Sequence, residues 1–233
     1  MNKLANNQVN ISFFSDNKSY QEEVENLETY KNIAKEITKS INGAVKVLDM
    51  GNGGFVNYKI PSSVRYIKAV DICIKKNKKI NFKHTIIDYK YGDVLSYKDS
   101  NKYDAVIMQN FLHHVVGENI KENYILLERA IKRMAVKTKR GGKLIILEST
   151  VPFWFELIEM ILFLPAKFLV PLFFKHPVTF QYTPKTIEQI LKKNSKNVVV
   201  RAIKHGEYQL MFGKKIPSNI TPAKMKLFLL QVK

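Results

Sequence analysis

The sequence predicts an α/β fold in which a doubly wound, mostly parallel sheet is covered by helices on both faces. Short apolar runs alternate with segments of helical periodicity through the first 150 residues, which is typical of consecutive β-α-β units. One of these runs, YDAVIMQ at 103–109, is almost unbroken, as expected for a strand that is buried on both faces. In such sheets, ligands bind beyond the carboxyl ends of the strands, where the strand order reverses.

The N-terminal half is predicted to begin with a helix over residues 15–41, because its apolar residues recur at helical spacing. Runs rich in β-branched residues at 45–50 and 64–72 predict two strands, and the segment HTIIDY at 84–89 predicts a third. The basic segment at 74–83 is interpreted as a short helix.

The C-terminal half continues this alternation. A helix is expected at 119–138, a strand at 143–148, a helix that begins at Thr183-Pro184, and a hairpin of two strands at 197–203 and 207–212. Gly141-Gly142 provides the stop signal of the long helix. Thr183 is the expected cap of the last helix, with Pro184 at its first position.

Composition indicates a globular protein in a reducing compartment. The chain has 233 residues, of which 45% are hydrophobic, enough for the core of a single domain over residues 1–233. The only cysteine, Cys73, excludes an intrachain disulfide, and the N-terminus lacks the apolar core of an export signal, so a cytoplasmic location is expected. The formal net charge of +18 comes mostly from Lys spread along the chain, whereas Arg is the better reader of phosphates and base edges. A nucleic-acid partner is therefore not favoured.

An acidic, glycine-rich turn follows the first predicted strand, in the segment VLDMGNGGFVNY at 47–58. Gly51 and Gly53 would let a ligand approach the backbone closely. A dinucleotide fingerprint needs a third glycine where this chain has Phe55, and the Lys-Ser/Thr pair of a phosphate loop is absent. Asp49 stands before the glycines, where it would repel a pyrophosphate and attract a cationic amine. A cationic ligand therefore fits this turn better.

This turn resembles the first motif of the class I S-adenosylmethionine-dependent methyltransferases, and later features follow in the family's order. Asp71 ends the second strand, where the family keeps an acid for the ribose hydroxyls. Gly92-Asp93-Val94 follows the third strand, where the family's acid reaches the adenine amine. The segment YDAVIMQNFLHHV at 103–115 resembles the fourth-strand motif of ubiquinone-biosynthesis-like small-molecule methyltransferases, and RGGKLIILE at 140–148 resembles the turn and strand that follow. The resemblance covers about residues 20–150.

The resemblance implies a Rossmann-like, mostly parallel sheet of seven strands with an antiparallel C-terminal hairpin, and S-adenosyl-L-methionine as the cofactor. It assigns the cofactor to Asp49, Gly51, Asn52 and Gly53 at the methionine end, Asp71 and Ile72 at the ribose, Asp93 and Val94 at the adenine, and Gln109 and Asn110 at the methionine part or the adenine edge. Phe14 and Tyr20, in a helical cap over residues 1–42, either close over the cofactor or pack on the surface. Phe55 and Pro61 depart from the family and predict a shortened first helix.

His113 and His114 lie just after the fourth strand, near the expected position of the methyl group. Histidine suits a general base for a hydroxyl acceptor, but either residue could instead hold the cofactor loop. The run QNFLHH lacks the prolines that amino-directed nucleic-acid methyltransferases carry at this place, and Cys73 is not placed as a cytosine-methylating nucleophile. No metal is expected, since the sequence has no compact carboxylate–histidine set, although Glu148 is a remote candidate.

An apolar insertion occupies residues 151–182. It is long enough for a membrane span, but two glutamates and Lys167 interrupt it, and Pro165 and Pro171 predict that it breaks into two short helices. Three interpretations remain open: packed core or the contact of a homodimer, a lid over an apolar substrate, or a peripheral membrane contact through residues 151–174.

Together these observations predict an enzyme that transfers a methyl group from S-adenosylmethionine to a small, largely apolar or lipid-like acceptor, at a hydroxyl oxygen. Two alternatives would use the same cofactor motifs. One is an RNA methyltransferase, whose binding would depend steeply on salt. The other is a cyclase or scaffold that binds the cofactor without transferring its methyl group.

Overall fold

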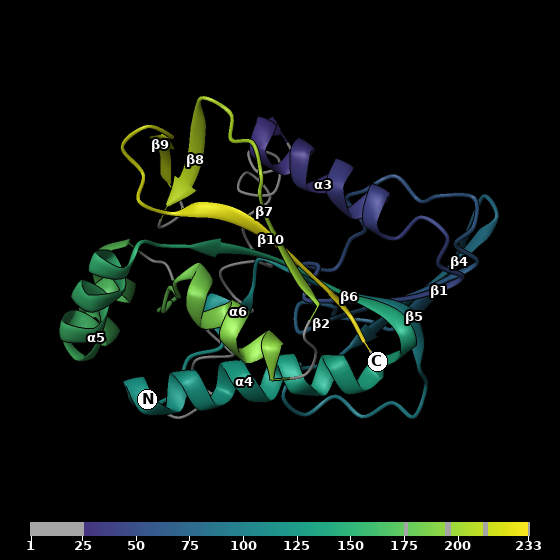
Figure 1. Ribbon diagram of the computed structural model, residues 1–233, viewed down its shortest axis with the longest axis horizontal. Coiled ribbons are helices and arrows are strands. Elements are labelled where there is room, and N and C mark those ends of the chain that lie inside the picture. Colours follow the sequence, from purple (N-terminus) through teal and green to yellow (C-terminus); the bar gives the residue numbers. More distant parts are fainter. Residues whose placement is uncertain (1–25, 175–176, 194–196, 212–213, 233) are drawn as a thin grey trace.

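The computed structural model describes residues 26–174, 177–193, 197–211 and 214–232. A central sheet has helices on both faces: α3 (Glu28–Ser40) lies on one side, and α4 (Ile120–Lys137) and α6 (Pro184–Lys192) lie on the other (Figure 1). The predicted α/β class is therefore confirmed. The start of the predicted N-terminal helix, with Phe14 and Tyr20, lies outside the described residues.

The larger sheet has a mostly parallel centre and antiparallel strands toward its edges. Its strands are β1 (Lys46–Met50), β2 (Tyr66–Asp71), β3 (Lys78–Phe82), β4 (Thr85–Tyr91), β5 (Tyr103–Gln109), β6 (Thr138–Thr150), β7 (Val198–Ala202) and β10 (Lys224–Gln231). They lie in the order β3-β4-β2-β1-β5-β6-β10-β7. The strands from β4 to β6 pair in parallel, whereas β3, β10 and β7 pair antiparallel. The strand order reverses between β1 and β5, so the predicted ligand edge lies beyond their carboxyl ends.

Two predictions about the C-terminal strands are wrong. In the described part of the chain the larger sheet has eight strands rather than seven, because β3 and β10 are not predicted and the segment at 207–212 does not belong to this sheet. The segments at 197–203 and 207–212 do not pair as a hairpin: β7 pairs with β10, and β8 (Tyr208–Met211) pairs with β9 (Lys214–Pro217) in a separate sheet. The position of β10 between β6 and β7 depends on partners distant in sequence, which local patterns do not show.

The basic segment at 74–83 is not a short helix, contrary to the prediction. It contains the edge strand β3, which pairs with β4 through a turn in which Lys83 has φ 56°. All five side chains of β3 are exposed, and lysines on an edge strand discourage pairing with another chain. The free edge of β4 therefore determines the conformation of this segment.

The apolar insertion forms one helix, α5 (Phe153–Phe174), where two short helices were predicted. Pro165 and Pro171 lie inside it, although an interior proline costs about 3 kcal/mol in a helix. Residues on both sides of Pro165 nevertheless hold the helix against the protein body: Glu156 and Glu159 before it, and Lys167 after it.

Strand β5 matches the predicted segment, and its alternate residues enter two separate cores. Val106 and Met108 pack in the core beneath α4 and α6, whereas Ala105 and Ile107 pack in the core beneath α3. The prediction of a strand buried on both faces is therefore confirmed. Helix α6 also begins where the sequence predicts, because the hydroxyl of Thr183 accepts a hydrogen bond from the Thr186 N–H at 3.2 Å.

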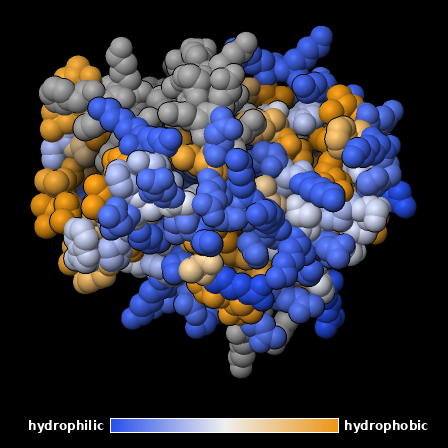
Figure 2. Space-filling view, turned by 90° about the horizontal axis from the view of Figure 1, so that it is seen from above, coloured by the Kyte–Doolittle hydropathy of each residue, from blue (hydrophilic) through white to orange (hydrophobic). Residues whose placement is uncertain are grey.

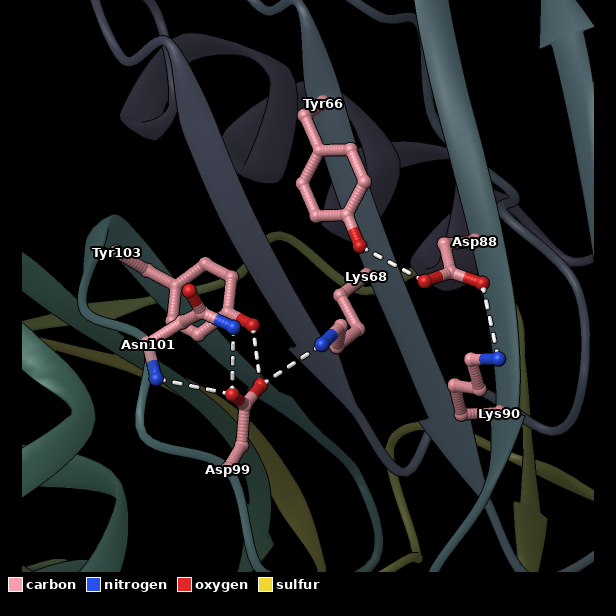
Figure 3. Close-up of polar contacts among 7 residues, drawn as sticks. All are labelled: Tyr66, Lys68, Asp88, Lys90, Asp99, Asn101 and Tyr103. Carbon is pink, nitrogen blue, oxygen red and sulfur yellow. Dashed lines mark hydrogen bonds and ion pairs between the residues drawn. The ribbon is translucent and has the colours of Figure 1, made fainter.

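A polar network lies over β2 and β4, on the α4 side of the sheet (Figure 3). Tyr66 and Lys90 contact Asp88 in a first group, and Lys68, Asn101 and Tyr103 contact Asp99 in a second group. At its centre, the Asp99 carboxylate accepts hydrogen bonds from the Tyr103 hydroxyl at 2.5 Å and the Lys68 ammonium at 3.0 Å. Burial alone would raise the pKa of Asp99, but hydrogen bonds from Tyr103, Asn101 and Lys68 hold that pKa well below its usual range. The network thus connects the loop after β4 to β2 and β5.

Asp99→Asn is expected to lower the free energy of unfolding by about 1–2 kcal/mol at neutral pH, because charge-assisted hydrogen bonds are lost. A carboxylate whose pKa is lowered by folding stabilises the protein above its unfolded pKa, near 4, and loses this effect as the pH falls. The difference between the variant and the parent protein should therefore shrink below about pH 4 in urea titrations. The control is Glu188→Gln, which breaks an exposed ion pair with Lys192. It should change the free energy of unfolding by less than about 0.5 kcal/mol, both at neutral pH and below about pH 4.

Candidate active site

The glycine turn after β1 has the conformation that only glycine adopts readily. Gly51, Gly53 and Gly54 have φ angles of 75°, 68° and 88°, in the left-handed region. The N–H of Gly51 donates to the Val70 carbonyl at 2.8 Å, which fixes the turn to β2. A Cβ on Gly51 would lie 2.1 Å from the ring of Phe111, so this position has no room for a side chain. In the described structure no helix separates this turn from β2, in line with the shortening predicted from Phe55 and Pro61.

Asp71 supports the turn from the end of β2. Its buried carboxylate accepts hydrogen bonds from the N–H groups of Gly53 at 2.8 Å and Cys73 at 2.7 Å. Burial raises the pKa of Asp71, against the lowering effect of these two bonds. Each carboxylate oxygen has two acceptor positions, so the arrangement leaves Asp71 with the capacity to accept hydroxyl donors as well. Ile72 follows it and is partly exposed.

Asp49 lies fully buried at the carboxyl end of β1. Its Oδ2 accepts hydrogen bonds from the Tyr58 hydroxyl at 2.9 Å and, more weakly, from the Asn52 amide at 3.4 Å. Its Oδ1 has no hydrogen-bond partner among the described residues. Burial raises the pKa of Asp49 to about 7, although the hydrogen bonds from Tyr58 and Asn52 lower it. A buried carboxylate with an unused oxygen is suited to accept a cationic donor.

Two further buried acceptors end the neighbouring strand. In the part of the chain that is described, Gln109 Oε1 and Asn110 Oδ1 also lack a hydrogen-bond partner. Asn110 has a left-handed backbone with φ 49°, held by a hydrogen bond from its N–H to the Leu147 carbonyl at 2.7 Å. Strands β1 and β5 pair directly, so the side chains of Asp49, Gln109 and Asn110 all lie at the carboxyl ends of adjacent strands. This is the point where the strand order of the sheet reverses. All three atoms are acceptors, so each is able to receive a hydrogen bond from a ligand.

Asp93 and Val94 lie beyond β4, on the other side of β2. The Asp93 carboxylate accepts the N–H of Leu95 at 2.7 Å, and the side chain of Val94 is buried. The guanidinium of Arg133 on α4 donates to the Val94 carbonyl at 3.1 Å. This loop is thus held at the same edge of the sheet as the glycine turn, while its contact with the adenine stays a prediction.

The two histidines form a short 3-10 helix, η1 (Leu112–His114), directly after β5. Nδ1 of the buried His113 lies 2.6 Å from Oε1 of Glu148, a fully buried residue on β6. Both oxygens of Glu148 also accept backbone N–H groups, from Leu112 and Ser149, at 2.8 Å each. Glu148 is therefore an acceptor, so Nδ1 of His113 is the donor and its Nε2 carries the free lone pair. The ring of His114 lies 4.2 Å from that of His113.

The sequence did not predict the pairing of Glu148 with His113, because Glu148 was considered only as a remote metal ligand. One sequence signal does point to this pairing: Glu148 lies at the end of the predicted strand next to β5. Glu148 directly follows Leu147, and Leu147 pairs with Gln109 at the end of β5. Among the described residues, no group of three potential ligands lies close enough to hold a metal ion.

Several known structures share this fold. The chain is similar to the N-methyltransferase NodS from Bradyrhizobium japonicum WM9 in complex with S-adenosyl-L-homocysteine, with a TM-score of 0.57 and 11% identity over 94% of this chain and 98% of that one. It is also similar to an S-adenosylmethionine-dependent methyltransferase from Methanosarcina mazei, with a TM-score of 0.51 and 16% identity over 84% and 96%. The YcgJ protein from Bacillus subtilis gives a TM-score of 0.52 and 12% identity over 88% and 98%. The chain therefore has the class I methyltransferase fold, as its motifs predicted.

No protein-family model and no curated protein matches the sequence.

Proposed function

We propose that this protein binds S-adenosylmethionine and transfers its methyl group to a small, largely apolar acceptor. The observation that carries the proposal is a set of three buried acceptor oxygens, on Asp49, Gln109 and Asn110, that have no hydrogen-bond partner among the described residues. They lie where the strand order reverses, in the fold of known methyltransferases. The α-ammonium of the cofactor's methionine part is a donor of the required charge and hydrogen-bonding capacity.

The residues of this edge fit the other parts of the cofactor as well. The backbone of Gly51 and Gly53 would border the methionine part, and Asp49 with Asn52 would supply acceptor and amide groups. Asp71 and Ile72 would hold the ribose, and Asp93 with Val94 would hold the adenine. Gln109 and Asn110 would accept donors from the methionine part or the adenine edge.

The cofactor supplies an electrophilic methyl group that is already activated by its sulfonium. The chain's own task is then to align the acceptor, exclude water and receive a proton from the acceptor group. His113 is suited to receive it at Nε2, because Glu148 fixes the tautomer and ring orientation through Nδ1. The same carboxylate would stabilise the imidazolium that forms. We assign the acceptor atom to a hydroxyl oxygen, because such a group needs a base during transfer.

Calorimetric titration with S-adenosylmethionine and S-adenosylhomocysteine tests the cofactor assignment. Micromolar binding of both is expected, because the site recognises parts that the two molecules share. Methyl transfer is then tested with labelled cofactor and a panel of apolar phenols, long-chain alcohols and amines. Labelled phenols or alcohols would support oxygen transfer, and labelled amines alone would contradict the acceptor atom. Binding without transfer to any acceptor would favour the cyclase or scaffold, and absence of binding would refute the proposal.

A further inference from the structure

Helix α5 turns its apolar side outward. Eleven large apolar side chains of this helix are exposed: Phe153, Trp154, Leu157, Ile158, Met160, Ile161, Leu162, Leu164, Phe168, Leu169 and Leu172. Ile161 and Phe168 are each 78% exposed, and Trp154 is 57% exposed. In Figure 2 apolar residues gather at the left end of the molecule, where Figure 1 places α5, beside a mostly hydrophilic surface. We call these eleven residues the outer face of α5.

The charged residues of α5 point toward the protein body instead. Glu156 is buried and accepts a hydrogen bond from the Tyr124 hydroxyl on α4 at 2.9 Å. Glu159 accepts the backbone N–H of Gln181 at 2.6 Å, and burial raises the pKa of Glu159 to about 8. These bonds anchor the first half of the helix by its polar side.

The second half is anchored on the same side. The Lys167 ammonium donates to the carbonyl of Glu118 at 3.2 Å and lies 3.5 Å from its carboxylate. Phe163 is buried against Phe180, with their rings perpendicular and their centroids 5.7 Å apart. Glu156, Glu159, Phe163 and Lys167 recur at intervals of three or four residues, so they share one side of the helix. The outward orientation of the apolar residues is therefore fixed by specific contacts.

The outer face is continuous along the helix. Trp154, Ile158, Ile161, Phe168 and Leu172 follow a spacing of three, four or seven residues, which forms a single stripe. The other residues of the outer face lie beside this stripe and widen it. The three charged residues of α5 all lie on the opposite side, against the protein body. A patch of this size on a folded protein is typical of a surface that binds something apolar.

The charge of the chain favours an anionic bilayer over a second copy as the occupant. A net charge of +18 opposes the approach of two copies and favours an anionic surface. Exposed lysines lie on the segments that contact or precede α5: Lys121 is three residues from Glu118, which Lys167 of α5 contacts, and Lys185 is three residues from Tyr182, which forms a bridge with Thr150 just before α5. Among the described helices, none is long and apolar enough to cross a membrane.

We propose that the outer face of α5 docks the protein on an anionic membrane surface, with the helix in the plane of the interface. The apolar side chains enter the boundary between headgroups and acyl chains, and nearby lysines remain among the lipid phosphates. The inner side of α5 keeps its contacts with the protein body. This inference rests on the geometry of α5 and does not depend on the proposed methyl transfer.

Trp154 allows a direct test, because it is the only tryptophan of the chain and lies in the outer face. The full chain is titrated with vesicles of phosphatidylcholine alone and with vesicles of equal parts phosphatidylcholine and phosphatidylglycerol. Trp154 emission should shift to shorter wavelength with the anionic vesicles and be quenched by lipids brominated on their acyl chains. The protein should float with the anionic vesicles, and added salt should weaken this binding.

Ile161→Glu with Phe168→Glu should reduce vesicle partitioning at least about tenfold, because two exposed apolar anchors are replaced by charges. The control is Ile220→Glu, at a residue that is 69% exposed outside α5, and it should leave partitioning unchanged. Light scattering of all variants tests the competing interpretation, in which a second copy of the chain covers the outer face of α5. A dimer that the double substitution dissociates, without vesicle binding by the parent protein, would overturn the proposal in favour of a second copy. Failure of the parent protein to bind either vesicle would overturn it as well.

Discussion

Asp49→Asn is expected to weaken S-adenosylmethionine binding about 30- to 1,000-fold, or roughly 2–4 kcal/mol. The substitution removes the negative charge that would pair with the cofactor's ammonium in a buried site. Calorimetry at pH 7.5 measures this loss. Asp99→Asn is the matched control, because the Asp99 side chain is only 5% exposed but belongs to the polar network on the α4 side of the sheet. An affinity for Asp49→Asn within twofold of the parent protein would place the ammonium elsewhere.

The pH dependence of binding gives a second, independent measure of the same residue. Because burial raises the pKa of Asp49 to about 7, the carboxyl takes up a proton below that pH and loses its attraction for a cation. Affinity should then fall up to tenfold for each pH unit below about 7. Asp71 contributes to the same field, and its own pKa is also raised, so a residual decrease is expected in Asp49→Asn. A slope identical to that of the parent protein would assign the titration to Asp71 instead.

Asp49→Asn should raise the free energy of unfolding, although it weakens cofactor binding. A carboxyl whose pKa is raised by folding contributes stability that is fully present below its unfolded pKa, 3.8, and is lost as the pH rises through about 7. The rise of the Asp49 pKa from 3.8 to about 7 corresponds to a loss of at most roughly 4 kcal/mol in the free energy of unfolding. Asparagine does not titrate, so the variant should gain stability relative to the parent protein between pH 4 and pH 8. A variant that binds poorly and unfolds more easily at pH 8 would show that Asp49 is mainly structural.

Much of this edge of the sheet, at the carboxyl ends of β1 and β2, can be predicted from the sequence. Asp49 and Asp71 lie at the carboxyl ends of β1 and β2, and the glycines follow β1 directly, so their positions are set by local signals. The turn after β1 and the acid at the end of β2 then meet because the two strands pair in parallel. Their contacts with the ribose and methionine parts stay predictions, as does the contact of Asp93 with the adenine.

Other features depend on contacts that local patterns do not contain. His113 and Glu148 are 35 residues apart and meet only because β5 pairs with β6. Hydropathy indicated helical structure in the insertion, but the outward direction of its apolar side depends on Tyr124 and on the backbone of Gln181. The segment at 74–83 became a strand because β4 offered a free edge. In each case the sequence identified the residues, while distant partners determined their conformation or role.

His113→Asn is expected to lower the turnover number about 10²- to 10⁴-fold while the affinity for S-adenosylmethionine changes less than about twofold. The loss reflects the removal of a proton acceptor from the transfer step. The measurement uses labelled cofactor with whichever phenol or alcohol of the panel is methylated, and calorimetry of the same variant. His114→Asn is the matched control, because the ring of His114 lies beside that of His113, the residue whose Nδ1 contacts Glu148. A large loss confined to His114→Asn would exchange the roles of the two residues.

Chemical rescue separates a base from a scaffold at this position. In His113→Gly, added imidazole can occupy the vacated volume and receive the acceptor's proton, so turnover should rise with imidazole concentration. A residue that only supports the loop after β5 would not be replaced by a free base, because free imidazole does not tie η1 covalently to its contact with Glu148, as the His113 side chain does. Rescue would therefore assign His113 to proton transfer, with Glu148 as the residue that positions it. Loss of cofactor binding in His113→Asn, without rescue of turnover in His113→Gly, would instead make the buried pair a structural support of the cofactor site.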